Sequence, residues 1–495
     1  MKLREIVKQL PCENSLSVQA RPYYNHSVSF NQTISPQERA DMLDRVGLNV
    51  FFFPSDMITG CDMLSDSGVT TMTDDQWAAL HQGDEAYGSN RGYFLLRERV
   101  LEVFGEAFFN HPEAGNPNAF LFHQGRACEN ALFVHLGRTG EGMVIPSNGH
   151  FDTTHANIIA NRIRPVNLFS PALTVDRSDE VFKGNMDVSE LKKLMDKYHD
   201  QVPLVYLTIT NNTGGGQPVS MKNIEEVAEL VHDYNIPLFF DACRFAENAW
   251  FIKHYEKGYN KERIETIVQK MFSKVDGFTI SFKKDGLVNM GGGMFFKNNG
   301  YFVKKYPQMP EAILDHQILT EGHPTYGGLS GRDIMALYVG LNTIVREEYL
   351  TYRIRQVQDF GENMDRNGLP VLKPVGGHAV YLDVNRFYHG TEMKPEEFGG
   401  IGLCAVLLAA YGHRACELGY FTFGQYDQKK KKEIFPRVNF VRFAVPRLRY
   451  EKQDLDAVVL SLASLYEHKE QIPGVEVIYG RDLALRHFKA RFRFK

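Results

Sequence analysis

The sequence predicts an α/β fold with a mostly parallel sheet covered by helices. From about residue 118, short apolar runs alternate with longer segments in which apolar residues recur every three or four positions. A chain of 495 residues, with 43% hydrophobic and 23% charged residues, is long enough for one large domain and a smaller one. Right-handed crossovers between parallel strands then place ligands beyond the carboxyl ends of the strands.

The expected elements follow one another in the βαβ order. The strand candidates are 118–122, 143–146, 203–209, 236–240, 277–281 and 293–296. The helices between them include 125–137, 188–198 and 220–234. Capping boxes that begin at Ser35 and Thr73 predict two earlier helices.

After about residue 345 the pattern changes to long helices, with strands at 379–384 and 440–445, which is typical of an α+β domain. We therefore expect three parts along the chain. They are an N-terminal arm and the start of a small domain in 1–60, a large cofactor-binding domain in 61–345, and the rest of the small domain in 346–495. The lysine run 429–432 is expected to be a solvated surface loop.

The charge balance favours a small-molecule partner. The formal net charge is -4, so no general electrostatic field attracts nucleic acid or an anionic membrane. The six cysteines are scattered, without a CxxC pair, which favours free thiols in a reducing compartment. No apolar run of about eighteen residues indicates a membrane helix, so we expect a cytoplasmic protein.

Two adjacent lysines end one of the expected strands. Lys283 and Lys284 follow the strand 277–281 and precede a glycine-rich turn. A half-desolvated lysine beside a second cation has its pKa lowered enough to form an imine with an aldehyde. Taken alone, the segment is more often a surface lysine pair.

Two further strand ends carry complementary chemistry. Asp241 follows the strand 236–240, where a carboxylate could keep a pyridine nitrogen protonated or could serve a metal, a ribose or a helix cap. The helix after the strand 118–122 begins with Gln124, Gly125 and Arg126. Free amides, the helix dipole and the Arg126 guanidinium could form an anion site there, and the alternative is a plain turn between strand and helix. Together the three strand ends match the phosphate, the pyridinium and the aldehyde carbon of pyridoxal phosphate.

Specific motifs occur along nearly the whole chain from about residue 40. They are Ser65-Asp-Ser-Gly68, Gly83-Asp-Glu-Ala-Tyr87, His123-Gln-Gly-Arg126, Gly215-Gly-Gln-Pro-Val-Ser220, Arg244-Phe-Ala-Glu-Asn-Ala249, Lys283-Lys-Asp285, Tyr326-Gly-Gly328 and Gly376-Gly-His-Ala379. In these motifs the sequence resembles the β-eliminating lyases, the family that comprises tryptophanase and tyrosine phenol-lyase. The resemblance implies aminotransferase fold type I and a homotetramer whose active sites are shared between subunits.

The resemblance also implies roles for individual residues. Lys284 is expected to hold pyridoxal phosphate as a Schiff base, and Ser67 and Arg442 are expected to bind the substrate, with Arg442 on its carboxylate. The remaining assignments are Gln124, Gly125, Arg126, Ser281 and Lys283 to the phosphate, Asp241 to the pyridinium, Asn212 and Arg244 to the phenolic oxygen, Phe151 to stacking on the ring, and Gly68, Glu85 and Asn289 to a potassium-type cation.

The implied reaction begins when Lys284 removes the α-proton of an amino acid and ends with loss of a β-substituent, which yields pyruvate and ammonium. An aromatic carbon leaves only after its ring is protonated, and Tyr87 matches the tyrosine acid of the family.

Three positions favour indole as the leaving group. Asp152 stands where phenol-lyases have threonine, and its carboxylate could accept the indole N–H. Leu418 replaces the arginine of phenol-lyases, and His487 matches a tryptophanase histidine that is phenylalanine in phenol-lyases. Each residue also has an ordinary explanation: Asp152 could cap a helix, Leu418 could be a core leucine, and His487 could be an ordinary histidine near the C-terminus.

Other positions depart from the tryptophanase pattern. Asn289 is the phenol-lyase choice, Phe282 and Gly286 replace small residues beside the lysine, and 421–435 carries an unfamiliar Gln/Lys stretch. A tyrosine phenol-lyase and a carbon-sulfur β-lyase therefore remain alternatives. A transaminase would need a keto acid, and a non-catalytic cofactor-binding protein would need neither Tyr87 nor Arg442.

Overall fold

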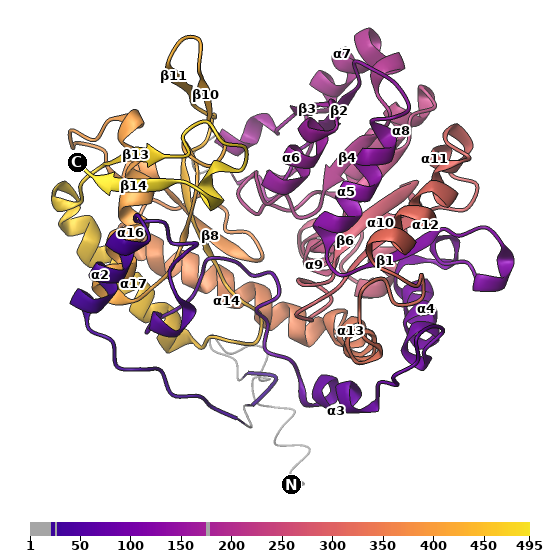
Figure 1. The fold of residues 1–495 in the computed structure, drawn as a ribbon, viewed down its shortest axis with the longest axis horizontal. Helices are drawn as coiled ribbons and strands as arrows, with labels where there is room; N and C mark the ends of the chain where they lie inside the picture. Colours follow the sequence, from indigo (N-terminus) through magenta and orange to yellow (C-terminus); the bar gives the residue numbers. More distant parts are fainter. Residues whose placement is uncertain (1–20, 25–26, 175–178) are drawn as a thin grey trace, which may run out of the picture.

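The computed structural model describes residues 21–24, 27–174 and 179–495. Figure 1 shows two lobes, with α14 (Glu347–Arg366) running from one to the other. The larger lobe is built on a seven-stranded sheet, and the smaller lobe combines N-terminal and C-terminal segments of the chain. The first twenty residues of the expected N-terminal arm, with Cys12, lie outside the described residues.

The large sheet is mostly parallel, as predicted. Its strands, in spatial order, are β1 (Ala119–Phe122), β7 (Gly292–Phe296), β6 (Gly277–Ser281), β5 (Leu238–Asp241), β4 (Val205–Thr208), β2 (Val144–Ser147) and β3 (Arg164–Asn167). Only β7 is antiparallel to its two neighbours. The six predicted strands are all present, and β3 is an additional edge strand.

Both faces of this sheet are covered by helices, because alternate residues of its strands enter two different hydrophobic cores. Phe120, Tyr206 and Phe239 belong to the core on one face, whereas their neighbours Leu121 and Phe240 belong to the core on the other. This alternation is the period of two that a pleated strand imposes. Strands buried on both faces read as the continuous apolar runs seen in the sequence.

The helices expected at 125–137, 188–198 and 220–234 form within one residue of those bounds, as α5 (Gly125–Leu136), α7 (Val188–Tyr198) and α8 (Met221–Asp233). The large lobe also contains α3 (Asp74–Gln82), α4 (Arg91–Phe104), α6 (Asp152–Ala160), α9 (Phe245–Tyr255), α10 (Ile264–Ser273), α11 (Tyr301–Lys305), α12 (Met309–Thr320) and α13 (Gly331–Ile344). The capping boxes at Ser35 and Thr73 both form, at the starts of α2 (Pro36–Arg45) and α3.

The small lobe contains a three-stranded antiparallel sheet, ordered β8 (Ala379–Asp383), β12 (Phe440–Ala444) and β9 (Cys416–Leu418). Its other elements are α15 (Val384–Phe387), α16 (Gly399–Tyr411), α17 (Lys452–Glu467) and the strand pairs β10 (Gln425–Asp427) with β11 (Lys432–Ile434) and β13 (Val475–Tyr479) with β14 (Arg491–Phe494). One hydrophobic core joins residues between 43 and 63 to residues between 357 and 492. The lysine run forms the exposed turn between β10 and β11, which projects from this lobe in Figure 1.

Within the described part of the chain, no helix combines the length and the apolar character needed to cross a membrane. The five described cysteines are unpaired thiols.

A buried ionic network lies where the two lobes meet. Arg447, which follows β12, is fully buried and donates from Nη1 to Asp66 Oδ2 at 3.0 Å. Its Nη2 donates to Glu247 Oε1 at 2.8 Å and to Asp285 Oδ1 at 2.9 Å. Asp285 directly follows Lys284, so the guanidinium of a small-lobe residue fixes the loop that carries this lysine.

We predict that Arg447→Met destabilises the protein by about 3–5 kcal/mol, because it leaves the buried Asp285 carboxylate without a guanidinium. It also removes one of the two guanidinium groups that Asp66 and Glu247 each contact. The free energy of urea unfolding measures this effect. Arg493→Met is the matched control, because Arg493 pairs with Glu476 on the exposed surface and its loss should cost less than about 1 kcal/mol. Equal losses in the two variants would contradict the role of the network.

Candidate active site

A cavity of about 90 Å³ opens at the carboxyl ends of the large sheet. Its walls come from both lobes, and most of the predicted site residues contribute to them. The predicted residues that line it are Ser67, Gln124, Gly125, Arg126, Phe151, Asn212, Asp241, Arg244, Ser281, Lys283, Lys284 and Arg442. The strand-end positions inferred from sequence therefore converge on one place.

The start of α5 forms a cradle for an anion. Gln124 is the N-cap, yet its side chain makes no capping bond to the helix, so the first amides of α5 stay available. A Cβ on Gly125 would lie 2.7 Å from Ser281 Cβ and 3.0 Å from the Ser281 amide nitrogen. Only glycine lets the helix lie so close to the end of β6, and the cradle fits a phosphate group.

Lys283 and Lys284 follow β6, and both are half-buried. Burial, with smaller contributions from the charges of Lys284 and Arg126, lowers the pKa of Lys283. The backbone oxygen of Lys283 accepts a hydrogen bond from the Gly68 amide at 2.8 Å, which anchors the turn. Asp241, at the end of the adjacent strand β5, is buried and also faces the cavity.

Asn212 and Arg442 form a pair with unused donors. Asn212 Oδ1 accepts from Arg442 Nη1 at 3.0 Å and from the Tyr381 hydroxyl at 3.0 Å, and it lies 2.9 Å from His378 Nε2. Arg442 Nη2 donates to the Leu64 carbonyl at 2.8 Å. Among the described residues, neither Asn212 Nδ2 nor Arg442 Nε has a partner, although both atoms are buried. Buried donors of this kind fit a ligand that brings acceptor oxygens.

Arg244 is held by a two-pronged ion pair. Its Nε and Nη2 donate to the two carboxylate oxygens of Asp66 at 3.0 and 2.7 Å. Burial opposes ionisation of Arg244, but the Asp66 charge outweighs it and raises the pKa of Arg244 above its ordinary value. Arg244 is therefore a fixed positive charge in the cavity wall.

A second cavity, of about 480 Å³, lies beyond the turn that begins α6. It contains Asp152 and His487, which come from different lobes and contact each other, with His487 Nε2 3.0 Å from Asp152 Oδ2. Burial would raise the pKa of Asp152, but the hydrogen bonds from His487 and the Thr153 amide outweigh it and lower the pKa. Asp152 is the first residue of α6, and Phe151 rather than Asp152 is the N-cap.

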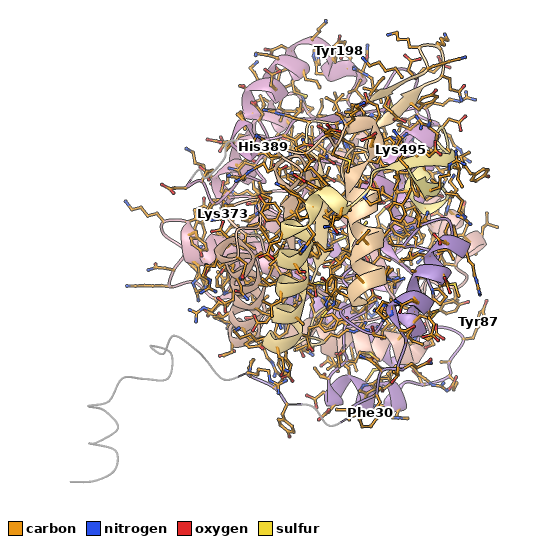
Figure 2. The ribbon with its side chains drawn as sticks, turned by 90° about the vertical axis from the view of Figure 1, so that its left-hand side faces the viewer. Phe30, Tyr87, Tyr198, Lys373, His389 and Lys495 are labelled. Atoms are coloured by element: carbon orange, nitrogen blue, oxygen red, sulfur yellow. The ribbon has the colours of Figure 1, made fainter. Side chains whose placement is uncertain are left out.

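Two of the residues expected to act on the substrate line neither of these cavities. Leu418 on β9 is buried in a hydrophobic cluster beside Phe440, the residue opposite it on the neighbouring strand β12. Tyr87 is 75% exposed and lies at the edge of the molecule in Figure 2, in edge contact with His323 and Tyr326. Within one chain, Tyr87 is thus separate from the residues it was expected to join.

The structure brings together two of the three residues proposed for a cation. Asn289 Nδ2 donates to the Gly68 carbonyl at 3.0 Å. Glu85 instead pairs with Arg332 at the exposed surface. The described residues contain no cluster of three or more His, Cys, Asp or Glu side chains suited to a metal ion.

Several cavity residues were missed by sequence reasoning. Asp66 lies inside the motif Ser65-Asp-Ser-Gly68. Thr210 follows the predicted strand 203–209, and Thr279 belongs to the predicted strand 277–281. Glu129 lies one helical turn after Gly125. The helical spacing of four residues was the available signal for Glu129, because it places Glu129 on the same face as the cradle.

Solved structures share this fold at low sequence identity. An aminotransferase from Staphylococcus aureus aligns with a TM-score of 0.54 at 14% identity, covering 82% of this chain and 94% of that one. The serine palmitoyltransferase of Sphingomonas wittichii gives 0.52 at 11% identity, covering 84% and 88%. The fold is aminotransferase fold type I, and its lysine, aspartate and anion cradle fit an enzyme that uses pyridoxal phosphate.

The family model described as beta-eliminating lyase matches residues 62–461. Tryptophanases of Salinibacter ruber and Rhodobacter capsulatus are each 40% identical, over 96% and 95% of this chain and 95% and 98% of their own. A tyrosine phenol-lyase of Fusobacterium nucleatum is 37% identical over 96% of this chain and 98% of its own. The chain belongs to the β-eliminating lyase family and is a pyridoxal-phosphate-dependent lyase.

We predict that Gly125→Ala lowers the affinity for pyridoxal phosphate at least about tenfold, because the added methyl group pushes the cradle away from Ser281. Titration of the apoprotein with the cofactor, followed by absorbance, measures the affinity. Gly140→Ala is the matched control, since a Cβ there meets no atom within 4 Å. An unchanged affinity in Gly125→Ala would refute the cradle.

Proposed function

We propose that the protein catalyses the β-elimination of L-tryptophan to indole, pyruvate and ammonium. The observation that carries this proposal is the contact between Asp152 and His487 in the second cavity. The two side chains are 335 residues apart, come from different lobes, and are the types that the resemblance associates with indole. The tryptophanase relatives support the same substrate.

Pyridoxal phosphate, when bound, supplies an electron sink for negative charge at the substrate α-carbon. The start of α5, with Ser281 and Lys283, would hold its phosphate, and Asp241 its ring nitrogen. Arg442 would bind the substrate carboxylate through its unpaired Nε, while its Nη1 stays on Asn212. The amine of Lys284 would then remove the α-proton.

Asp152 would accept the indole N–H at the other end of the substrate. Its pKa is lowered despite burial, so the carboxylate is ionised at neutral pH and offers its full charge to the ring. A carboxylate in this place stabilises the positive charge that the indole acquires on protonation. His487 would hold Asp152 in position from the small lobe.

Tyr87 would protonate the indole ring from a neighbouring subunit. Its exposure in one chain supports this arrangement, because Tyr87 lies at the edge of the molecule and lines neither cavity of its own chain. We propose accordingly a homotetramer with shared active sites, and a potassium-type cation held by Gly68 and Asn289 of one copy and Glu85 of another. Scattered free thiols support a cytoplasmic location.

Tyrosine phenol-lyase activity is the second candidate. The identity to the Fusobacterium nucleatum enzyme supports it, as does Asn289. Against it, Asp152 gives the second cavity a carboxylate that would repel a phenolate, and Leu418 offers no positive charge.

A panel of amino acids tests the proposal, with pyruvate measured beside indole, phenol or thiol. We expect tryptophan to give equal amounts of indole and pyruvate, and Lys284→Ala to release neither, because the base and the anchor of the cofactor are the same residue. Phenol from tyrosine, or thiol from S-alkylcysteines, as the fastest product would replace the proposal by one of the alternatives.

Removal of the Asp152 charge should discriminate between substrates. We predict that Asp152→Asn lowers kcat/KM for tryptophan about 100-fold or more but affects S-methylcysteine far less, because the latter has no ring to stabilise. His155→Phe, in the same cavity but without a hydrogen bond to Asp152, is the matched control and should leave the ratio of the two substrates unchanged. Equal losses for both substrates would remove Asp152 from recognition of the leaving group.

A further inference from the structure

Glu129 is a buried carboxyl group in the wall of the cofactor cavity that the reaction above does not use. It lies on α5, one turn after Gly125, and is 6% exposed. Its Oε1 accepts a hydrogen bond from the Thr154 hydroxyl at 2.5 Å. Its Oε2 is buried and has no partner among the described residues.

The surroundings of Glu129 favour its neutral form. Burial raises the pKa of Glu129 to about 8, and the charge of Asp241 on β5 acts in the same direction. The Thr154 hydrogen bond and the charges of Lys284 and Arg126 oppose this rise without cancelling it. Glu129 also interacts electrostatically with Tyr206 on β4 and Cys128 on α5.

Asp241 and Glu129 therefore form a pair of buried carboxyl groups that does not readily carry two negative charges. Two interacting acids in a region of low dielectric lose their protons in separate steps. A cation that arrives within this cluster reverses the balance, because it compensates the second charge. The pyridinium expected beside Asp241 is such a cation.

We propose that Glu129 is a positioning residue for the cofactor, which holds a proton in the apoprotein and gives it up when the pyridinium binds beside Asp241. The O–H bond of the neutral carboxyl breaks, and the proton passes to the ring nitrogen or to the buffer. The site then contains two carboxylates and one ring cation in place of a single carboxylate. This inference rests on the placement of the cofactor under the proposed function and not on the identity of the leaving group.

A purely structural role for Glu129 can be separated from this one. The Thr154 hydrogen bond joins α5 to α6, so Glu129 could serve only to hold the two helices together. Glu129→Gln keeps an oxygen that accepts this bond but cannot ionise. Thr154→Val removes the bond and leaves the acid in place.

Isothermal titration calorimetry of the apoprotein with pyridoxal phosphate, in two buffers of different ionisation enthalpy, counts the protons exchanged on binding. At pH 7 the wild type should release about one proton per chain more than Glu129→Gln, because the acid is mostly neutral before binding. Thr154→Val should resemble the wild type. Equal proton counts in the wild type and Glu129→Gln, with all variants equally stable, would leave Glu129 a structural residue and overturn the proposal.

Infrared spectra of the apoprotein test the same acid without the cofactor. In the wild type, the carbonyl band of a neutral carboxyl group should disappear between pH 7 and 9. Burial also raises the pKa of Asp285, to about 7, so this group can contribute a similar band. Subtraction of the Glu129→Gln spectra isolates the band of Glu129. Thr154→Val should move this loss about half to one pH unit higher, since the lost bond favours the anion. Because no substrate is present, failure here is distinct from failure of the proposed function.

Discussion

The buried ionic network around Arg447 is the constraint on which both lobes depend. Arg447 and Arg244 share Asp66, and Arg353 joins Arg447 on Glu247, so each carboxylate meets at least one guanidinium. Buried charges cost several kcal/mol each when they are unpaired. The network therefore tolerates few other arrangements of the lobes, and it fixes the positions of the Lys284 loop and Arg244 relative to each other.

The sequence predicted those parts of the site that depend on local chain geometry. Lys284, Asp241 and Gly125 each lie at or just after the end of a strand of one sheet, and strand ends at one edge of a sheet must lie together. The edge strand β3 was missed because its four residues include Arg164 and Pro165, and edge strands carry charges and proline instead of a continuous apolar run.

Contacts between distant segments had no local signal. Asp152 and His487 are joined only because the C-terminal segment of the small lobe packs against the start of α6, and no spacing rule connects residues 335 positions apart. Only the family resemblance indicated both residues. Glu129 was missed for a different reason: its spacing from Gly125 places it on the cradle face of the helix, but a glutamate in a helix is usually exposed, and its burial depends on the neighbouring elements.

The start of α6 contributes side chains to two cavities at once. Phe151 and Thr153 line the cavity of the cofactor, whereas His150 and Asp152 line the larger cavity beyond it. Alternate residues of the segment 150–153 thus point into two different cavities. A shift of the turn that moved Phe151 within its cavity would also displace Asp152 from His487. In the proposed reaction, binding of the ring and departure of the leaving group are therefore coupled through the backbone of four consecutive residues.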